Sequence, residues 1–365
     1  MKWKRILFNE RAELGSNTLL DIAIAIVDHD LSFRKQGLMF GNMGTSLFLF
    51  QMGKWKVDNH IQMEGLEMLT SLIRRTNTEL ETMRNFNMLD VSFDTGISGI
   101  GWGINYLLQN KFIDNEFSGI FTLTDAIILR RMITVVQEPE LDKLYQAIGI
   151  GLYAISQDSR LSKEYLRRFI KELFNRVKEN DTSKKIVRQS FNTIIGLIRL
   201  LEKINVKFPD INHTKELILW FYRVFARFPM SSSTFNLQIL YTLLNCYESM
   251  SWVEGELNQR AKYIIQNAKN IKIEAGLQKG LVASAHCFNR IYQYTGNPLY
   301  REASIACFDK LLCRSFHIQG AWNTSSKGLW CLHYGFLNGI AGIGMALLAA
   351  IADTEPQWDE CIFLS

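Results

Sequence analysis

Proline is scarce in this chain of 365 residues, and cysteine is confined to its last third. There are 5 prolines, whereas average usage of about 5% predicts roughly eighteen. Because proline interrupts helix interiors and central strands, its scarcity favours long helices. The 6 cysteines include no Cys-x-x-Cys pair, and the first ten residues lack the apolar segment of a signal peptide. We therefore expect reduced thiols and a cytoplasmic location.

Common catalytic signatures are also missing. The sequence has no GxSxG, P-loop, HExxH or EF-hand pattern. Residues 335–352 carry no charge, which reaches the lower length limit of a transmembrane helix. That segment contains Asn338 and four glycines, and it lacks flanking basic anchors. It is therefore predicted to be a buried core helix.

The residues that are present describe a folded protein with one strongly basic segment. The chain is 47% hydrophobic and 21% charged, with a net charge of +5. Residues 160–188 hold ten basic and four acidic side chains. We interpret this segment as a solvated helix exterior, with an acidic partner as the alternative. No aromatic pattern or motif for nucleic-acid binding accompanies the charges.

A glycine-containing pattern recurs along the chain. Each copy places glycine, or a small or polar residue, before an apolar run, at intervals of roughly 50 residues. The seven repeat positions are Gly44, Gly99, Gly149, Gly196, Gln238, Ala283 and Gly342.

One unit is clearest near residue 280. Residues 281–294 are mostly apolar at helical spacing, Gly296 and Pro298 predict a helix end, and residues 299–316 are amphipathic. Each unit is thus predicted to be an apolar inner helix followed by a charged outer helix, with no strands. Hairpins of this kind stack as an open solenoid or a closed ring. Glycine at each inner-helix start favours the ring, because inner helices can crowd together there.

These motifs resemble the lanthionine synthetase C-like family. The resemblance rests on five pieces that span most of the chain: Gly41-NMG-Thr-Ser, Ser92-FDTGISGIGWGI-Asn105-Tyr106, Asn289-RIYQYT-Gly296, Leu337-NGIAGIG and Glu355-PQ-Trp358-Asp359. It implies an all-α fold, an (α/α) toroid of about seven helical hairpins in a single domain over residues 1–365. It also implies peptide maturation, in which a cysteine thiol adds to a dehydrated serine or threonine.

Cyclases of that family hold a catalytic zinc ion with two cysteines and one histidine. Zinc lowers the pKa of the substrate thiol so that the thiolate attacks at neutral pH. In this sequence Gln278 and Lys279 stand at the Cys-His positions, and Ser233 aligns with the first cysteine. We therefore predict no zinc and no other cofactor, as in a pseudoenzyme; whether any turnover occurs stays open.

Two local pairs were considered as replacement ligands. His286-Cys287 lies well inside an inner helix, where consecutive side chains point about 100° apart. We expect a packed cysteine and a histidine bonded to neighbouring backbone. Cys331-Leu-His333 precedes the seventh repeat and offers two ligands where three or four are usual. Asp94, near Gly96, could serve in a glycosidase-like carboxylate pair, but capping of the following helix is the expected role.

Three functions remain in view. The first is a zinc-free protein that binds a precursor peptide or partner enzyme in peptide natural-product maturation. The second is an enzyme on the same fold with non-zinc chemistry, and the third is a carbohydrate-active α/α toroid with paired carboxylates. For the first, we predict that four residues surround one binding cavity at the inner-helix starts, with no membrane span and no nucleic acid: Trp102, Lys279, Trp330 and His333.

Overall fold

The computed structural model consists mainly of helices. It describes residues 3–28, 36–85, 88–138, 143–179, 191–226, 237–244, 251–268, 275–278, 280–313, 317–318, 321–322 and 333–364. The α-helices are α1 (Asn9–Val27), α2 (Asn42–Lys56), α3 (Asn59–Thr82), α4 (Ile97–Gln109), α5 (Asp125–Gln137), α6 (Leu144–Gln157), α7 (Arg160–Glu179), α8 (Phe191–Lys207), α9 (Thr214–Ala226), α10 (Leu237–Leu244), α11 (Ser251–Asn267), α12 (Leu281–Thr295), α13 (Pro298–Leu312) and α14 (Ile340–Ile351).

The chain divides into two compact units. The terminal unit comprises residues 1–83, 249–360 and 364–365, and the middle unit comprises residues 84–248 and 361–363. Each is described by itself below. The single domain over residues 1–365 stays a prediction.

The predicted repeat of inner and outer helices is present. All seven repeat positions fall within the first six residues of an even-numbered helix, from α2 to α14. The even-numbered helices are the apolar ones; every residue of α14 is buried. The odd-numbered helix that follows has one charged face, most clearly in α7, where apolar residues such as Leu166 and Phe169 are buried. Helical periodicity in the sequence thus separates the two kinds of helix correctly.

Glycine at the repeat position leaves room for a side chain of the neighbouring repeat. In the middle unit, a Cβ atom on Gly149 of α6 would collide with Phe93, which precedes α4. In the terminal unit, a Cβ atom on Gly44 of α2 would lie 2.5 Å from Cβ of Phe336, which precedes α14. The last repeat therefore packs on the first as the second packs on the third. Within the terminal unit, the first and last inner helices of the chain are thus in direct contact.

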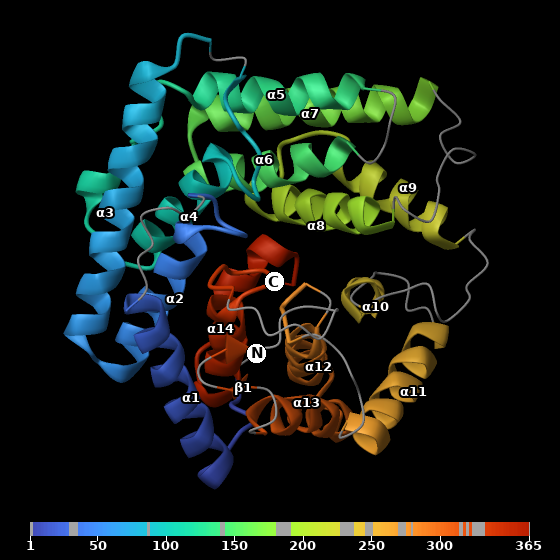
Figure 1. Ribbon diagram of the computed structural model, residues 1–365. Coiled ribbons are helices and arrows are strands. Elements are labelled where there is room, and N and C mark those ends of the chain that lie inside the picture. The colour runs from blue at the N-terminus through green and yellow to red at the C-terminus, as the bar shows by residue number, and fades with distance from the viewer. Residues whose placement is uncertain are drawn as a thin grey trace. The chain divides into compact units, whose positions relative to one another are not determined.

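The chain start packs on the last inner helix, α14. α1 packs along α14, beside which it lies in Figure 1. The backbone N–H groups of Ile6 and Leu7 both donate to the carbonyl of Ala350, at 2.9 and 3.1 Å. The N-terminal helix thus supplies the outer partner of the last inner helix.

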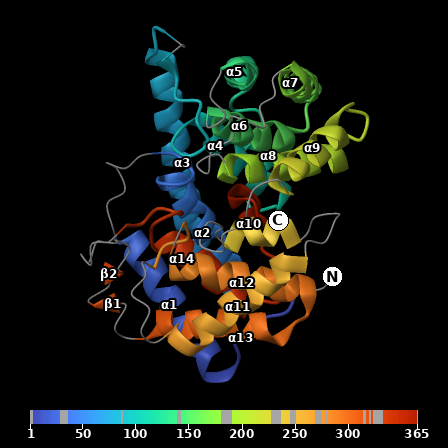
Figure 2. The same ribbon diagram turned by 90° about the vertical axis from the view of Figure 1, so that its right-hand side faces the viewer.

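In the middle unit, outer helices α5 and α7 pack together and against inner helix α6, which in turn packs on α8. Figures 1 and 2 both show α5 and α7 side by side, outside α6 and α8. A buried hydrogen bond of 2.6 Å from the Tyr153 hydroxyl to Asp125 joins α6 to α5. Burial raises the pKa of Asp125, although this bond opposes the shift.

Two expectations about local structure have different outcomes. The absence of strands is wrong for four residues, because β1 (His317–Ile318) and β2 (Ala321–Trp322) form a short antiparallel hairpin. The buried core helix within residues 335–352 is confirmed as α14, which is 12 residues long. Among the described residues, no helix has the length and apolar character needed to span a bilayer.

Candidate functional site

The loops before three inner helices meet at one end of the terminal unit. The Leu337 N–H donates to the carbonyl of Met39, and the Leu277 N–H donates to the carbonyl of Leu337, both at 2.9 Å. Leu337 precedes α14, Met39 precedes α2 and Leu277 precedes α12, so the central loop is bonded to one loop on each side. We call this end of the unit, formed by residues 36–41, 275–278 and 333–339, the mouth.

The loops share one fold. The N–H of Ile340, at the start of α14, donates to the carbonyl of His333, seven residues earlier, at 2.7 Å. Val282 of α12 makes the same bond to Ala275, and Ile97 of α4 makes it to Asp90 in the middle unit. A common turn therefore precedes the inner helices and fixes where each loop side chain lies.

An amide pair occupies part of the mouth. The Asn338 side chain donates from Nδ2 to Oε1 of Gln278 at 3.1 Å; Gln278 is exposed and Asn338 is half-buried. The resemblance gives Gln278 a zinc-ligand position, while Ser233 and Lys279 lie outside the described residues. Glutamine is not a usual zinc ligand, and the Gln278 oxygen already accepts a hydrogen bond, so Gln278 does not fit a zinc ion. No cluster of three or more His, Cys, Asp or Glu side chains suited to a metal exists among the residues described.

The four predicted binding residues are only partly located. Trp102, in the middle unit, is 1% exposed and stacks on Tyr106, with ring centroids 5.4 Å apart. His333 is exposed at the mouth of the terminal unit. Lys279 and Trp330 lie outside the described residues. The structure thus gives Trp102 a packing role within its helix layer, and the common cavity stays a prediction.

The pair His286-Cys287 does not face a common ion. His286 Nε2 lies 2.8 Å from Asp359 Oδ2, and both side chains are fully buried. Cys287 is buried, which raises the pKa of its thiol to about 12. The expected packed cysteine is therefore confirmed. The expected partner of His286 is wrong, because it is a carboxylate 73 residues away rather than neighbouring backbone.

Asp359 is the centre of a buried charged network. Arg290 of α12 donates to both carboxylate oxygens, from Nε at 2.6 Å and from Nη2 at 2.8 Å. Arg290 also donates to Glu355 and to the carbonyl of Pro356. Burial alone would raise the pKa of Asp359, but Arg290 and His286 hold it below its ordinary value. This network attaches the segment after α14 to α12.

Asp94 does not cap α4. Gly96 is the N-cap residue and no side chain bonds the first turn of the helix, so the capping prediction is wrong. Asp94 instead accepts a hydrogen bond from the Tyr145 hydroxyl at 3.3 Å. Burial raises the pKa of Asp94, with a smaller contribution from nearby Asp90, against the effect of Tyr145. The Tyr145 hydroxyl, at the start of an inner helix of the middle unit, thus donates to a carboxyl group whose pKa is raised by burial.

The described part of the basic segment is α7. Lys163 and Arg167 both pair with Asp210, at 3.0 Å each. Arg176 donates to the carbonyl of Val136, and the ammonium of Lys178 lies over the Phe174 ring. These contacts support the interpretation of α7 as a solvated exterior whose cations pack and pair locally.

Known proteins provide a separate comparison. Residues 238–363 match the family model described as lanthionine synthetase C-like protein. A solved structure of nisin cyclase is similar to this chain with a TM-score of 0.64 and 13% identity, covering 95% of this chain and 96% of the other. No curated protein matches the sequence. The predicted resemblance and the all-α (α/α) toroid class are therefore confirmed, the first by the family model and the second by the shared fold.

Sequence reasoning missed two features of these sites. Asn338 lies within a motif that carries the resemblance, yet nothing local in the sequence pairs it with Gln278, 60 residues earlier. The bond between Asp359 and His286 is equally non-local. A usable signal existed, because both Trp358-Asp359 and Asn289-Arg290 belong to motifs that carry the resemblance, and a buried arginine requires an acidic partner.

Proposed function

Taking the chain as a member of the lanthionine synthetase C-like family, we propose that it binds a precursor peptide, or an enzyme acting on one, in peptide natural-product maturation, without zinc. The family match and the fold shared with nisin cyclase support a role connected with peptide modification. The cytoplasmic location expected from the sequence is part of the same proposal.

The observation that carries the proposal is the amide pair at the mouth. Gln278 and Asn338 stand where three inner helices begin, and the amide of Gln278 occupies a position that the family resemblance gives to a metal ligand. An amide offers both donors and acceptors, which match the N–H and C=O groups of an extended peptide. It cannot activate a thiol as zinc does. The mouth therefore suits peptide recognition better than cyclisation.

One observation favours the second candidate, an enzyme with non-zinc chemistry. Asp94 has a raised pKa and contacts the hydroxyl of Tyr145, which is 41% exposed. A carboxyl group tuned in this way is suited to general acid–base catalysis. If this candidate holds, Asp94→Asn and Tyr145→Phe would abolish turnover of the peptide while leaving its binding intact.

The proposal is tested with candidate precursor peptides and candidate maturation enzymes taken from genes near that of this chain. Calorimetry should show saturable binding of the full chain to one of these peptides or enzymes. Lys279→Glu should weaken that binding about tenfold or more, through loss of one charge-assisted contact. Lys262→Glu, on the exposed face of α11, is the matched charge-reversal control and should change little. Absence of binding to both peptide and enzymes would contradict the proposal.

A further inference from the structure

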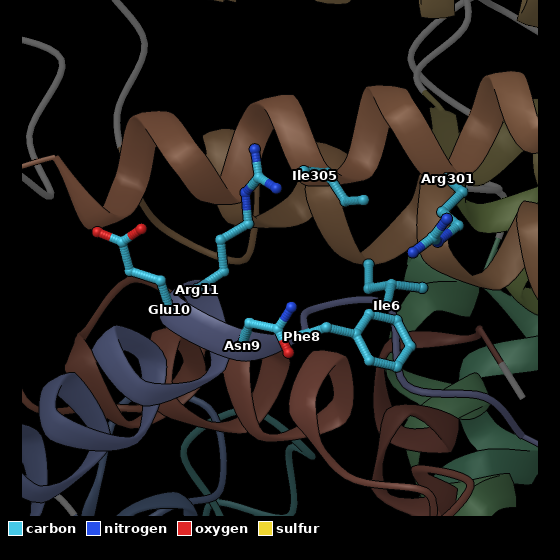
Figure 3. Close-up of a pocket in the computed structure, with 7 residues that line it drawn as sticks. All are labelled: Ile6, Phe8, Asn9, Glu10, Arg11, Arg301 and Ile305. Atoms are coloured by element: carbon cyan, nitrogen blue, oxygen red, sulfur yellow. The ribbon is translucent and has the colours of Figure 1, made fainter.

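A second feature of the terminal unit lies away from the mouth, between the chain start and α13. It is an open pocket of about 480 Å³, within the range of ligand sites. Its lining residues are Ile6, Phe8, Asn9, Glu10, Arg11, Arg301 and Ile305. Figure 3 shows Arg301, Ile6 and Phe8 gathered at one end of the pocket, with Arg11 and Glu10 at the other.

The two guanidinium groups in this pocket differ in their partners. Arg11 makes a two-pronged pair with Asp309, at 2.7 and 3.0 Å. Arg301 has no carboxylate partner among the described residues; its guanidinium lies 5.5 Å from the centre of the Phe8 ring. Arg5 approaches the same ring at 5.2 Å. Cations therefore surround an aromatic side chain that is itself 42% exposed.

The walls beside Arg301 are apolar. Ile6 is buried, at 1% exposure, and Ile305 is half-buried, so both form a fixed surface next to the charge. A guanidinium binds a carboxylate through two parallel hydrogen bonds, and an apolar wall beside it favours an adjacent aliphatic or aromatic group. Glu10 lies at the opposite end, so it does not neutralise Arg301.

We propose that this pocket binds an acidic side chain of a peptide, flanked by an apolar residue. The proposal rests on the peptide-binding function above and adds a second contact site, distinct from the mouth. Arg301 supplies the carboxylate contact, Phe8 stacks beneath that guanidinium, and the half-buried Ile305 contacts the neighbouring apolar side chain.

The probe is a fluorescently labelled peptide with acetyl and amide ends and the sequence Leu-Glu-Leu-Glu-Leu, compared with its Leu-Gln-Leu-Gln-Leu analogue. Anisotropy with the full chain should show binding of the glutamate peptide at least about tenfold tighter than the glutamine peptide. Arg301→Gln should remove that difference. Phe8→Leu should reduce the difference in affinity, because leucine keeps the apolar volume but lacks the aromatic ring of the cation–π contact. Arg74→Gln, which removes one exposed charge on α3, should leave the difference unchanged.

Equal affinities for the two peptides would overturn the proposal. So would an equal loss in Arg301→Gln and Arg74→Gln, because each removes one positive charge and the attraction would then depend on net charge alone. Competition with unlabelled ligands gives a further outcome. If an oligonucleotide displaces the labelled peptide at a lower concentration than the unlabelled glutamate peptide does, and this displacement is lost in Arg301→Gln, the pocket binds phosphate and the proposal is overturned. Mouth variants such as Gln278→Ala should not affect this probe, so failure here is distinguishable from failure of the proposed function.

Discussion

At the scale of residues, the repeat glycines act by leaving space. A Cβ atom on Gly101 of α4 would collide with the ring of Tyr153 in α6. One on Gly151 of α6 would lie 2.7 Å from a methyl group of Leu200 in α8. Both glycines are two positions after the repeat position, and each faces a large side chain of the next inner helix. The glycine pattern in the sequence thus reflects where inner helices pack closely on one another.

Gly101→Ala should accordingly lower the free energy of unfolding by about 1–3 kcal/mol, the usual effect of overpacking a close contact. Gly255→Ala is the matched control, because Gly255 is helical, exposed and has no neighbouring atom within 4 Å of the added Cβ. That control should raise stability by about 0.5–1 kcal/mol. Urea unfolding of both variants checks the opposite signs; destabilisation of the same size in both would contradict this account.

At the scale of elements, the sequence predicted the helices better than their connections. The amphipathic pattern gave inner helix α12 and outer helix α13 to within a few residues at each end. Gly296 ends α12 in the left-handed conformation, with φ of 72°, as the sequence suggested. The partners of His286 and Gln278 could not be predicted, because periodicity reports which face of a helix is buried and not which distant segment covers it.

The attachment of the C-terminal segment to α12 yields a pH-dependent prediction. The folded protein holds the pKa of Asp359 below its ordinary value, so this carboxylate adds stability at neutral pH. That stability is lost as the pH falls below about 4 and through the folded-state pKa. Asp359→Asn should reduce the free energy of unfolding at pH 7 by about 3–5 kcal/mol, because Arg290 loses its buried carboxylate partner and keeps the ion pair with Glu355, which is 52% exposed.

Between pH 5 and pH 2, the free energy of unfolding should fall less in this variant than in the unmodified chain. The difference should equal roughly the contribution of one carboxylate. Asp353→Asn provides the control, because Asp353 is 60% exposed and its ion pair with Arg5 is long, at 3.8 Å. Its effect should stay within about 0.5 kcal/mol. Equal acid sensitivity of Asp359→Asn and the unmodified chain, measured by urea unfolding across that pH range, would show that Asp359 is not the stabilising group.

At the scale of the whole molecule, the fold and the chemistry of its sites depend on different residues of the sequence. Seven repeats, the inner helices and the packing of the last repeat on the first follow from glycine spacing and hydrophobic pattern. A metal site, by contrast, depends on a few side chains that packing leaves unconstrained, so the fold alone does not predict whether zinc ligands are present. Gln278 illustrates this, since it lies in a loop of conventional geometry while its side chain bonds Asn338.

Zinc content tests the proposed loss of the metal site. Because the resemblance gives Ser233, Gln278 and Lys279 the family's ligand positions, purified protein should hold well under one zinc ion per chain after dialysis. Elemental analysis measures this directly. Near-stoichiometric zinc that disappears in Cys331→Ala or His333→Ala would place a metal site before the seventh repeat and restore the case for cyclase chemistry.

The central claim is that this ring binds its peptide without zinc. Its most direct test is calorimetric titration of a candidate precursor peptide, taken from a gene near that of this chain, into the full chain, before and after treatment with EDTA followed by dialysis. The account predicts saturable binding with the same Kd in both samples and no change when zinc is added back. Binding that vanishes on chelation and returns with zinc would contradict it.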